Sequence, residues 1–173
     1  MINKCRIFPP DIQGNRKATP MQYHAAAEGG ITSADMGIFE QIRHVLREMP
    51  DMIFDANDRH WGARKNKVSC HLICRALTNH FDVWFRDGYF MSHYQHSWLL
   101  CRSGASIIDP YPVAGAAPFI VANSLASPWN KLYTRSNNFN VLFSRPAFQE
   151  QLEQTSRAMS ETIKRLRLGP PLS

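Results

Sequence analysis

Three residues of the sequence have the types and the order of a nucleophilic site: Cys70, His96 and Asp109. A cysteine thiolate attacks carbonyl carbons, a nearby histidine can take and return a proton, and an aspartate can hold that histidine in one tautomer. The cysteine begins a helical pattern, and the other two residues lie in short apolar segments that are typical of strands. The sequence therefore predicts a thiol nucleophile with a base and an orienting acid.

The segment around Cys70 predicts a helix that begins at the cysteine. Ser69 can cap it, and the apolar residues that follow have the spacing of one buried stripe: Leu72, Ile73, Ala76 and Leu77. A thiol in the first turn lies at the positive end of the helix dipole, which favours the reactive thiolate. Backbone N–H groups of the same turn could bind the oxyanion of a tetrahedral intermediate. The alternative is that this cysteine is only a small buried hydrophobic residue.

A hairpin turn decides whether the histidine and the aspartate can meet. The segments on either side of Ser103-Gly104 are apolar enough to be strands, and this dipeptide is typical of a hairpin. A two-residue loop places Trp98 opposite Asp109, with His96 as a diagonal neighbour about 7–8 Å away on the same face. A three-residue loop would put the two side chains on opposite faces. In the first register Trp98 would also keep water away from the pair.

Two other interpretations use some of the same residues. A zinc site would draw on four side chains in and after the cysteine helix: Cys70, His71, Cys74 and His80. These residues lack a familiar zinc-finger spacing, and a helix would point them in different directions. Asp109 precedes a proline, and Asp-Pro commonly opens a loop. We expect no metal and no cofactor.

A cysteine that begins a helix, then His-x-Trp on a strand, then Asp-Pro after the next strand resembles the transglutaminase-like branch of the papain-like cysteine enzymes. The resemblance covers residues 69–112, about a quarter of the chain. It implies Cys70 as nucleophile, His96 as general base and then acid, and Asp109 as the residue that orients the histidine. The chain departs from the family just before the cysteine, where the usual glycine and aromatic neighbours are missing.

That departure leaves part of the site to other residues. Three further side chains are candidates for binding the oxyanion or the substrate: Asn66, Gln95 and Trp98. The two amides can donate N–H groups to a developing negative charge.

Composition sets the size and the class of the protein. The 173 residues, 44% of them apolar, are most simply one domain. Residues 1–30 predict a loosely structured arm, and 31–173 a single catalytic α+β domain. The net charge of +6 suits an acidic protein surface, a nucleic acid or an anionic membrane. There is no basic-aromatic nucleic-acid motif and no apolar run that could cross a membrane, so nucleic acid and a membrane span are not expected.

The cysteines and the N-terminal residues bear on the cellular compartment. The four cysteines do not form a disulfide pattern, and no signal peptide is recognisable. We therefore expect a cytoplasmic protein. A bacterial effector exported into a host cell without a cleaved signal would have the same features.

Apolar periodicity and turn residues predict the remaining elements. A mostly antiparallel sheet with the cysteine helix packed on it gives an α+β, papain-like or transglutaminase-like fold. Asp87-Gly88 predicts a tight turn between two strands. A cluster of Trp129, Leu132 and Tyr133 is expected to pack in the core, with packing across the site or an exposed recognition surface as alternatives. Helices are expected at residues 33–49, 70–79 and 146–166, and strands at residues 81–86, 89–91, 119–122 and 141–143.

These features together predict a cysteine-dependent hydrolase or acyltransferase that acts on a carboxamide or peptide bond through a thioester. Water as acceptor gives glutamine deamidation or peptide cleavage, and an amine acceptor gives transamidation. The expected substrate is a protein or peptide. The alternative is a non-catalytic basic interaction module that binds an acidic protein partner. A close and accessible set of Cys70, His96 and Asp109 would favour the enzyme, and a buried thiol would favour the module.

Overall fold

A computed structural model describes residues 30–49, 53–54, 67–92, 94–110, 118–127, 129–136 and 143–166. The described helices are α2 (Ser33–Glu48), α3 (Cys70–Thr78), α5 (Pro146–Leu166) and the short 3₁₀ helix η2 (Asn130–Leu132). The described strands are β1 (Ile53–Phe54), β2 (Lys67–Val68), β3 (Val83–Phe90), β4 (Tyr94–Cys101), β5 (Ser106–Asp109), β6 (Phe119–Ala122) and β7 (Tyr133–Arg135). Among the described helices, none is long and apolar enough to cross a membrane. The predicted arm falls almost entirely outside these ranges.

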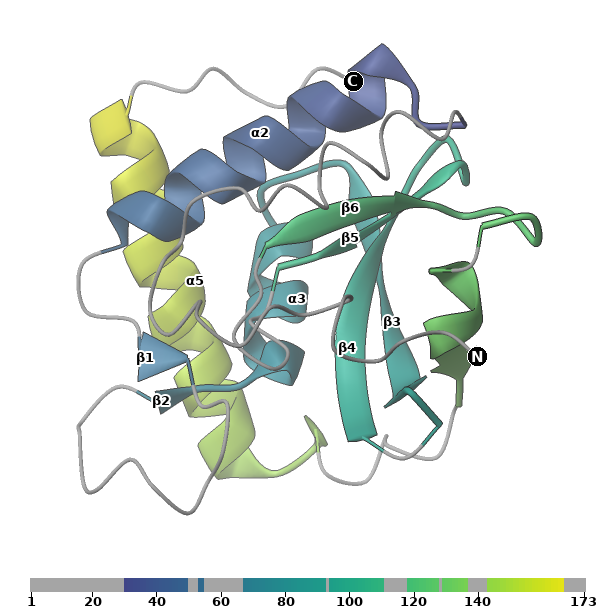
Figure 1. Cartoon of the computed structure of the whole chain (residues 1–173). Coiled ribbons are helices and arrows are strands. Elements are labelled where there is room, and N and C mark those ends of the chain that lie inside the picture. The colour runs from purple at the N-terminus through teal and green to yellow at the C-terminus, as the bar shows by residue number, and fades with distance from the viewer. Residues whose placement is uncertain are drawn as a thin grey trace.

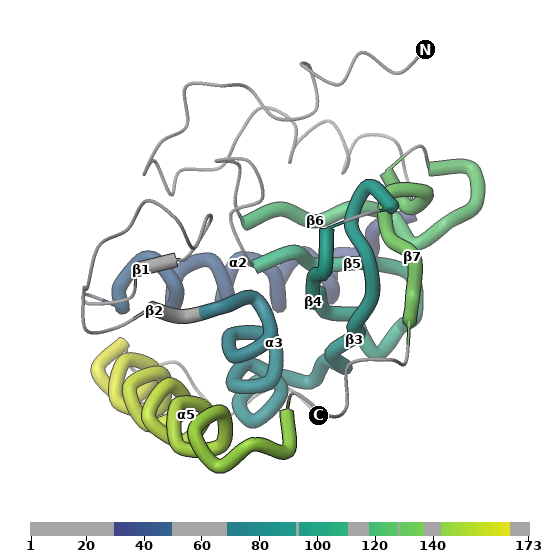
Figure 2. Tube along the Cα trace, turned by 90° about the horizontal axis from the view of Figure 1, so that it is seen from below, coloured from purple at the N-terminus to yellow at the C-terminus, as the bar shows by residue number. Residues whose placement is uncertain are grey.

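The centre of the fold is a curled antiparallel sheet of five strands in the order β6-β5-β4-β3-β7 (Figure 1). Helix α3 runs along β3 and β4 on one side and against α5 on the other, so α5 forms an outer layer (Figure 2). Strands β1 and β2 form a separate parallel pair, and β2 leads directly into α3. The α+β class and the mostly antiparallel sheet are therefore confirmed.

The two faces of the sheet carry different clusters of buried side chains. The face toward the helices includes Leu99 and Ile108, which pack with residues of α2 and α3. The opposite face carries a smaller cluster of Trp98, Ile107 and Val121. Because side chains alternate along a strand, His96 shares the face of Trp98, whereas the residue between them points toward the helices. Neighbouring residues of β4 can therefore contribute to contacts on both faces of the sheet.

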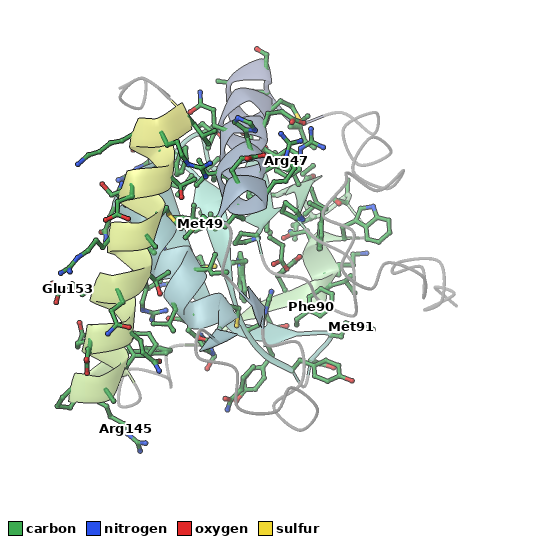
Figure 3. The ribbon with its side chains drawn as sticks, turned by 90° about the vertical axis from the view of Figure 1, so that its left-hand side faces the viewer. Arg47, Met49, Phe90, Met91, Arg145 and Glu153 are labelled. Atoms are coloured by element: carbon green, nitrogen blue, oxygen red, sulfur yellow. The ribbon has the colours of Figure 1, made fainter. Side chains whose placement is uncertain are left out.

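The outer helices have the ends that the sequence predicts. Thr32 caps α2, and its side chain accepts a hydrogen bond from the Asp35 N–H at 3.0 Å. Helix α5 begins at Pro146, as expected for a proline in a first turn. Figure 3 shows α2 and α5 side by side, with Met49 between them and Glu153 on the outward side of α5. Both predicted helices are confirmed, and so is the short strand at 119–122. The strand predicted at 141–143 lies outside the described residues except for its last position.

The prediction of a tight turn at Asp87-Gly88 is wrong. Strand β3 continues through both residues and ends at Phe90, and the chain reverses at Met91 and Ser92, which have φ of 52° and 66°. The glycine is required for packing. A Cβ on Gly88 would lie 2.0 Å from a backbone oxygen of β7 and 2.8 Å from the Trp98 ring. The glycine therefore lets β7 and the tryptophan approach β3 closely.

Replacing Gly88 with alanine should consequently destabilise the fold by about 1–3 kcal/mol, because β7 and Trp98 must both move. Thermal unfolding and urea unfolding of the purified variant measure this loss. Gly37→Ala is the matched control: Gly37 lies in α2, a Cβ there meets nothing within 4 Å, and alanine favours the helix. The control should gain roughly 0.5–1 kcal/mol. Equal effects of the two changes would contradict the packing role of Gly88.

Candidate active site

Cys70 is the first residue of α3, as the sequence predicts. Ser69 precedes it in extended conformation, and its hydroxyl accepts a hydrogen bond from the Leu72 N–H at 3.4 Å. The cap fixes the first turn, so the thiol lies at the positive end of the helix. The cysteine is 7% exposed. It is therefore at the edge of the core rather than on an open surface.

His96 and Asp109 meet as the hairpin argument predicts. Strands β4 and β5 pair Leu99 with Ile108 and Leu100 with Ile107. Continuing this register places residue 98 opposite Asp109, with His96 on the diagonal. The His96 Nε2 lies 2.7 Å from the Asp109 Oδ2, and both side chains are buried. The carboxylate thus holds Nε2 as the protonated nitrogen and leaves Nδ1 as the basic one.

The turn itself differs from the expected two-residue loop. Strand β4 ends at Cys101 and β5 begins at Ser106, so four residues connect them. The Gly104 N–H donates to the Cys101 carbonyl oxygen at 2.9 Å, and Gly104 has a φ of +73° that favours glycine. The register is unchanged because the four-residue loop is centred on Ser103-Gly104, as the two-residue loop would be, and the same side chains therefore share a face.

Aromatic side chains surround the His96–Asp109 pair. Trp98 is 4% exposed, and its ring stacks near the His96 ring at a centroid distance of 6.4 Å. Phe90 contacts His96 edge-on at 5.8 Å. These rings exclude water from the pair, so its hydrogen bond acts in a medium of low dielectric constant. The expected place of Trp98 beside the pair is the one observed.

Tyr133 is a site residue whose role the sequence did not reveal. Its hydroxyl donates to the Asp109 Oδ2 at 2.9 Å, and its ring packs on Trp98 at 5.1 Å. Burial, together with the charge of Asp109, raises the pKa of Tyr133 well above its ordinary value, so the hydroxyl keeps its proton. Among the described contacts, Asp109 therefore receives hydrogen bonds from the histidine and from a neutral donor. The other two members of the predicted cluster, Trp129 and Leu132, are only partly buried.

A second histidine, His71, follows the cysteine directly in α3 and has its own set of polar contacts. The His71 Nδ1 is 2.5 Å from the Ser97 Oγ and 3.5 Å from the Asp87 Oδ1. Ser97 in turn donates a hydrogen bond to the same Asp87 oxygen. Arg75 donates to both carboxylate oxygens, at 3.2 and 2.7 Å. The sequence placed His71 only in a hypothetical zinc site, and nothing in the sequence linked it to Asp87.

Both histidines lie close enough to the thiol to act on its ionisation. Burial disfavours its ionisation, but the hydrogen bonds and positive charges of His71 and His96 outweigh burial and lower the pKa of Cys70 from 9.0 to about 6. Burial likewise opposes both imidazolium ions. Asp87 and Cys70 nevertheless raise the pKa of His71 to about 9, and Asp109 and Cys70 raise that of His96 to about 10. Around neutral pH the site therefore holds a thiolate between two imidazolium ions.

Opposite charges alternate through the whole site. Six groups form this charge row, in the order Arg75, Asp87, His71, Cys70, His96 and Asp109. Each charge has partners of opposite sign, and the charges of the row sum to zero. Buried charges are tolerated when they are paired in this way.

Among the remaining predicted candidates, none of those that the structure describes joins the site. Asn66 lies outside the described residues. Gln95 is exposed on β4 and alternates with His96, so it points away from the face of that ring. The zinc candidates do not converge: Cys74 is fully buried in the helix-side core, and the His80 ring contacts the Ser156 carbonyl oxygen at 3.3 Å.

Comparison with known proteins gives no relative. Neither a family model, nor a curated protein, nor a solved structure matches the chain. The resemblance to transglutaminase-like enzymes thus depends on the residues and contacts described above.

Alkylation by iodoacetamide measures the ionisation of Cys70 directly. We expect its rate to rise with pH through a midpoint of about 6, because the thiolate reacts and acid protonates it. At pH 7 about nine tenths of the thiol would be ionised, against about one hundredth at a pKa of 9. Peptide mapping by mass spectrometry separates the cysteines, and Cys101 is an internal control because burial raises its pKa to about 12. A Cys70 midpoint at 8.5 or higher would contradict the two-histidine arrangement.

Proposed function

We propose that this chain is a cysteine-dependent acyl-transfer enzyme of the transglutaminase-like branch of papain-like enzymes. Its substrate would be a carboxamide or peptide bond of a protein. The observation that carries the proposal is the connection from Cys70, at the start of α3, through His96 to Asp109, with 2.7 Å between the histidine and the carboxylate. Nucleophile, proton carrier and orienting acid are in the order that this chemistry requires.

In the first half-reaction the Cys70 thiolate attacks the carbonyl carbon. A carbon–sulfur bond forms, and the carbonyl electron pair moves onto oxygen. The oxyanion would lie near the N–H groups of the first turn of α3, where the helix dipole is positive. When the oxyanion collapses, the carbon–nitrogen bond breaks and the His96 imidazolium donates its Nδ1 proton to the leaving amine or ammonia. A thioester and a neutral His96 remain.

In the second half-reaction neutral His96 takes a proton from water, and the hydroxide attacks the thioester carbon. Collapse of this second intermediate breaks the carbon–sulfur bond and restores the thiolate and the imidazolium. The product is a carboxylic acid, so the net reaction is hydrolysis. An amine that replaces water would give a new amide and therefore transamidation.

An activated ester tests whether the thiol accepts an acyl group. With p-nitrophenyl acetate we expect a burst of p-nitrophenol and an acetyl group on the peptide that contains Cys70. Cys70→Ala should remove both signals. Equal p-nitrophenol release by wild type and variant, with no acetylated cysteine, would refute the proposal. Ammonia release from glutamine peptides and incorporation of a fluorescent amine then separate deamidation from transamidation.

One observation favours the alternative of a non-catalytic module that binds an acidic protein: the cysteine is only 7% exposed. Such a module would keep binding its partner when Cys70 is replaced by alanine, and no acyl group would transfer to the wild-type thiol. The acetylation experiment therefore also decides between the two functions.

A further inference from the structure

The site contains two imidazole–carboxylate pairs, and the chemistry proposed above uses only one. His96 shares a sheet face with Trp98, whereas Ser97, which contacts His71, lies on the face toward the helices. The contacts of the two histidines consequently lie on opposite faces of β4. Their carboxylate partners also come from different strands, Asp87 from β3 and Asp109 from β5.

The His71 ring is held in place by a chain of contacts. Asp87 and Ser97 are directly opposite one another in the β3–β4 ladder, and both contact Nδ1 of this ring. Asp87 is itself fixed by the bidentate contact with Arg75. The guanidinium of Arg75 lies 3.7 Å from the centre of the Phe143 ring and 4.3 Å from that of Phe85. A bidentate pair stacked between aromatic rings has few alternative positions.

The second pair is also shielded from water. The side chains of His71 and Asp87 are 16% and 11% exposed, compared with 4% and 0% for His96 and Asp109. Charges at these depths are weakly screened, so a positive ring beside the sulfur acts strongly on it. Because Nδ1 faces the carboxylate and the serine, Nε2 is the nitrogen that can donate to the thiolate.

We propose that His71 is a second catalytic group, which holds the Cys70 thiolate in its charged form while His96 carries protons to and from the substrate. The inference rests on the proposed function. His96 loses its proton to the leaving group and is neutral in the thioester state. When the thioester breaks, the sulfur regains its negative charge, and the His71 imidazolium has remained charged throughout to receive it. One histidine thus transfers protons, and the other stabilises charge.

The pH dependence of iodoacetamide alkylation at Cys70 tests this division in wild type, His71→Gln, His96→Gln and the double variant. The charged or titratable groups around the sulfur are His71, Cys74 and Arg75 from α3, Asp87 from β3, His96 from β4, Asp109 from β5 and Tyr133 from β7. We expect each single variant to raise the Cys70 midpoint only part of the way from about 6 toward 9, and the double variant to bring it to 9 or higher. His44→Gln, in α2, is the matched control and should leave the midpoint unchanged.

Two results would overturn the inference. One is a Cys70 midpoint in His71→Gln equal to that of the wild type. The other is a Cys70 midpoint in His96→Gln alone that has risen all the way to the ordinary thiol value. Ser97→Ala provides a second variant if His71→Gln does not fold. It removes the 2.5 Å contact with Nδ1 and changes no charge, so the Cys70 midpoint should rise by a smaller amount. An unchanged midpoint in that variant would count against the role of His71.

The acyl-transfer experiment separates this inference from the proposed function. With p-nitrophenyl acetate, His71→Gln should slow release of the acetyl group from Cys70 at neutral pH more than the control does, because the departing sulfur has lost a charge partner. If the wild-type thiol accepts no acetyl group, the proposed function fails. The alkylation midpoints still decide in that case whether His71 stabilises the thiolate.

Discussion

Replacing Asp109 with asparagine should lower the rate of acyl transfer to Cys70 by about 10⁴-fold. The corresponding change in serine proteases, which share the orienting acid, has an effect of this order. Asparagine removes the negative charge that keeps His96 protonated, and its amide N–H₂ favours the tautomer with the wrong nitrogen protonated. The burst of p-nitrophenol from p-nitrophenyl acetate measures the rate, and thermal unfolding verifies that the variant folds.

Tyr133→Phe is the control for this prediction. It removes one hydrogen bond to Asp109, the 2.9 Å contact from the hydroxyl, but leaves both the carboxylate and its 2.7 Å contact with His96. We expect a loss of about tenfold or less, which corresponds to one neutral hydrogen bond. Similar rates for Asp109→Asn and wild type would show that the His96–Asp109 pair only stabilises the fold.

Replacing Arg75 with alanine should destabilise the fold by about 3–5 kcal/mol. The guanidinium is the only arginine partner of Asp87 among the described contacts, and its removal leaves a carboxylate that is 11% exposed without its bidentate donor. Contacts with Phe143 and Phe85 are lost as well. Urea unfolding followed by circular dichroism measures the change in the free energy of unfolding.

Arg102→Ala is the matched control, since Arg102 also pairs with an aspartate, Asp82, and stacks on Trp84 at 4.5 Å. Both partners of that pair are exposed, so its loss should cost less than about 1 kcal/mol. An Arg75→Ala effect no larger than that of the control would contradict the structural role of the row.

Acid provides a further check of the same pair. Burial alone would raise the pKa of Asp87, but the hydrogen bonds from His71, Arg75 and Ser97 hold it well below its ordinary value. The contribution of Asp87 to the free energy of unfolding is therefore present above pH 3.8 and is lost as pH falls toward the folded-state pKa.

The His96–Asp109 half of the site was predictable because its geometry depends on one hairpin. Strand side chains alternate with a period of two, so any even loop between β4 and β5 gives the same faces. The prediction that His96 and Asp109 share a face assumes a two-residue loop, and it also holds for the four-residue loop of the structure. The start of α3 was also predictable, because a serine before an apolar helical stripe is a local signal.

The His71–Asp87 half was not predictable because it depends on contacts between distant segments. Asp87 and Gly88 have the composition of a turn, yet β4 and β7 on either side hold them inside β3. Tertiary packing overrides turn propensity at this point. Tyr133 reaches Asp109 only because β7 pairs with β3, at the far edge of the sheet from β6. Such a contact leaves no periodic trace in the sequence.

The charge row has a consequence for how the protein would recognise a partner. Because its six charges cancel, the row produces a field that weakens rapidly with distance and adds nothing to the overall charge of the protein. Long-range attraction of an acidic protein must therefore come from basic residues elsewhere in the chain. Encounter with a partner and ionisation of the thiol depend on separate sets of charges, so surface substitutions can change the first and leave the second intact.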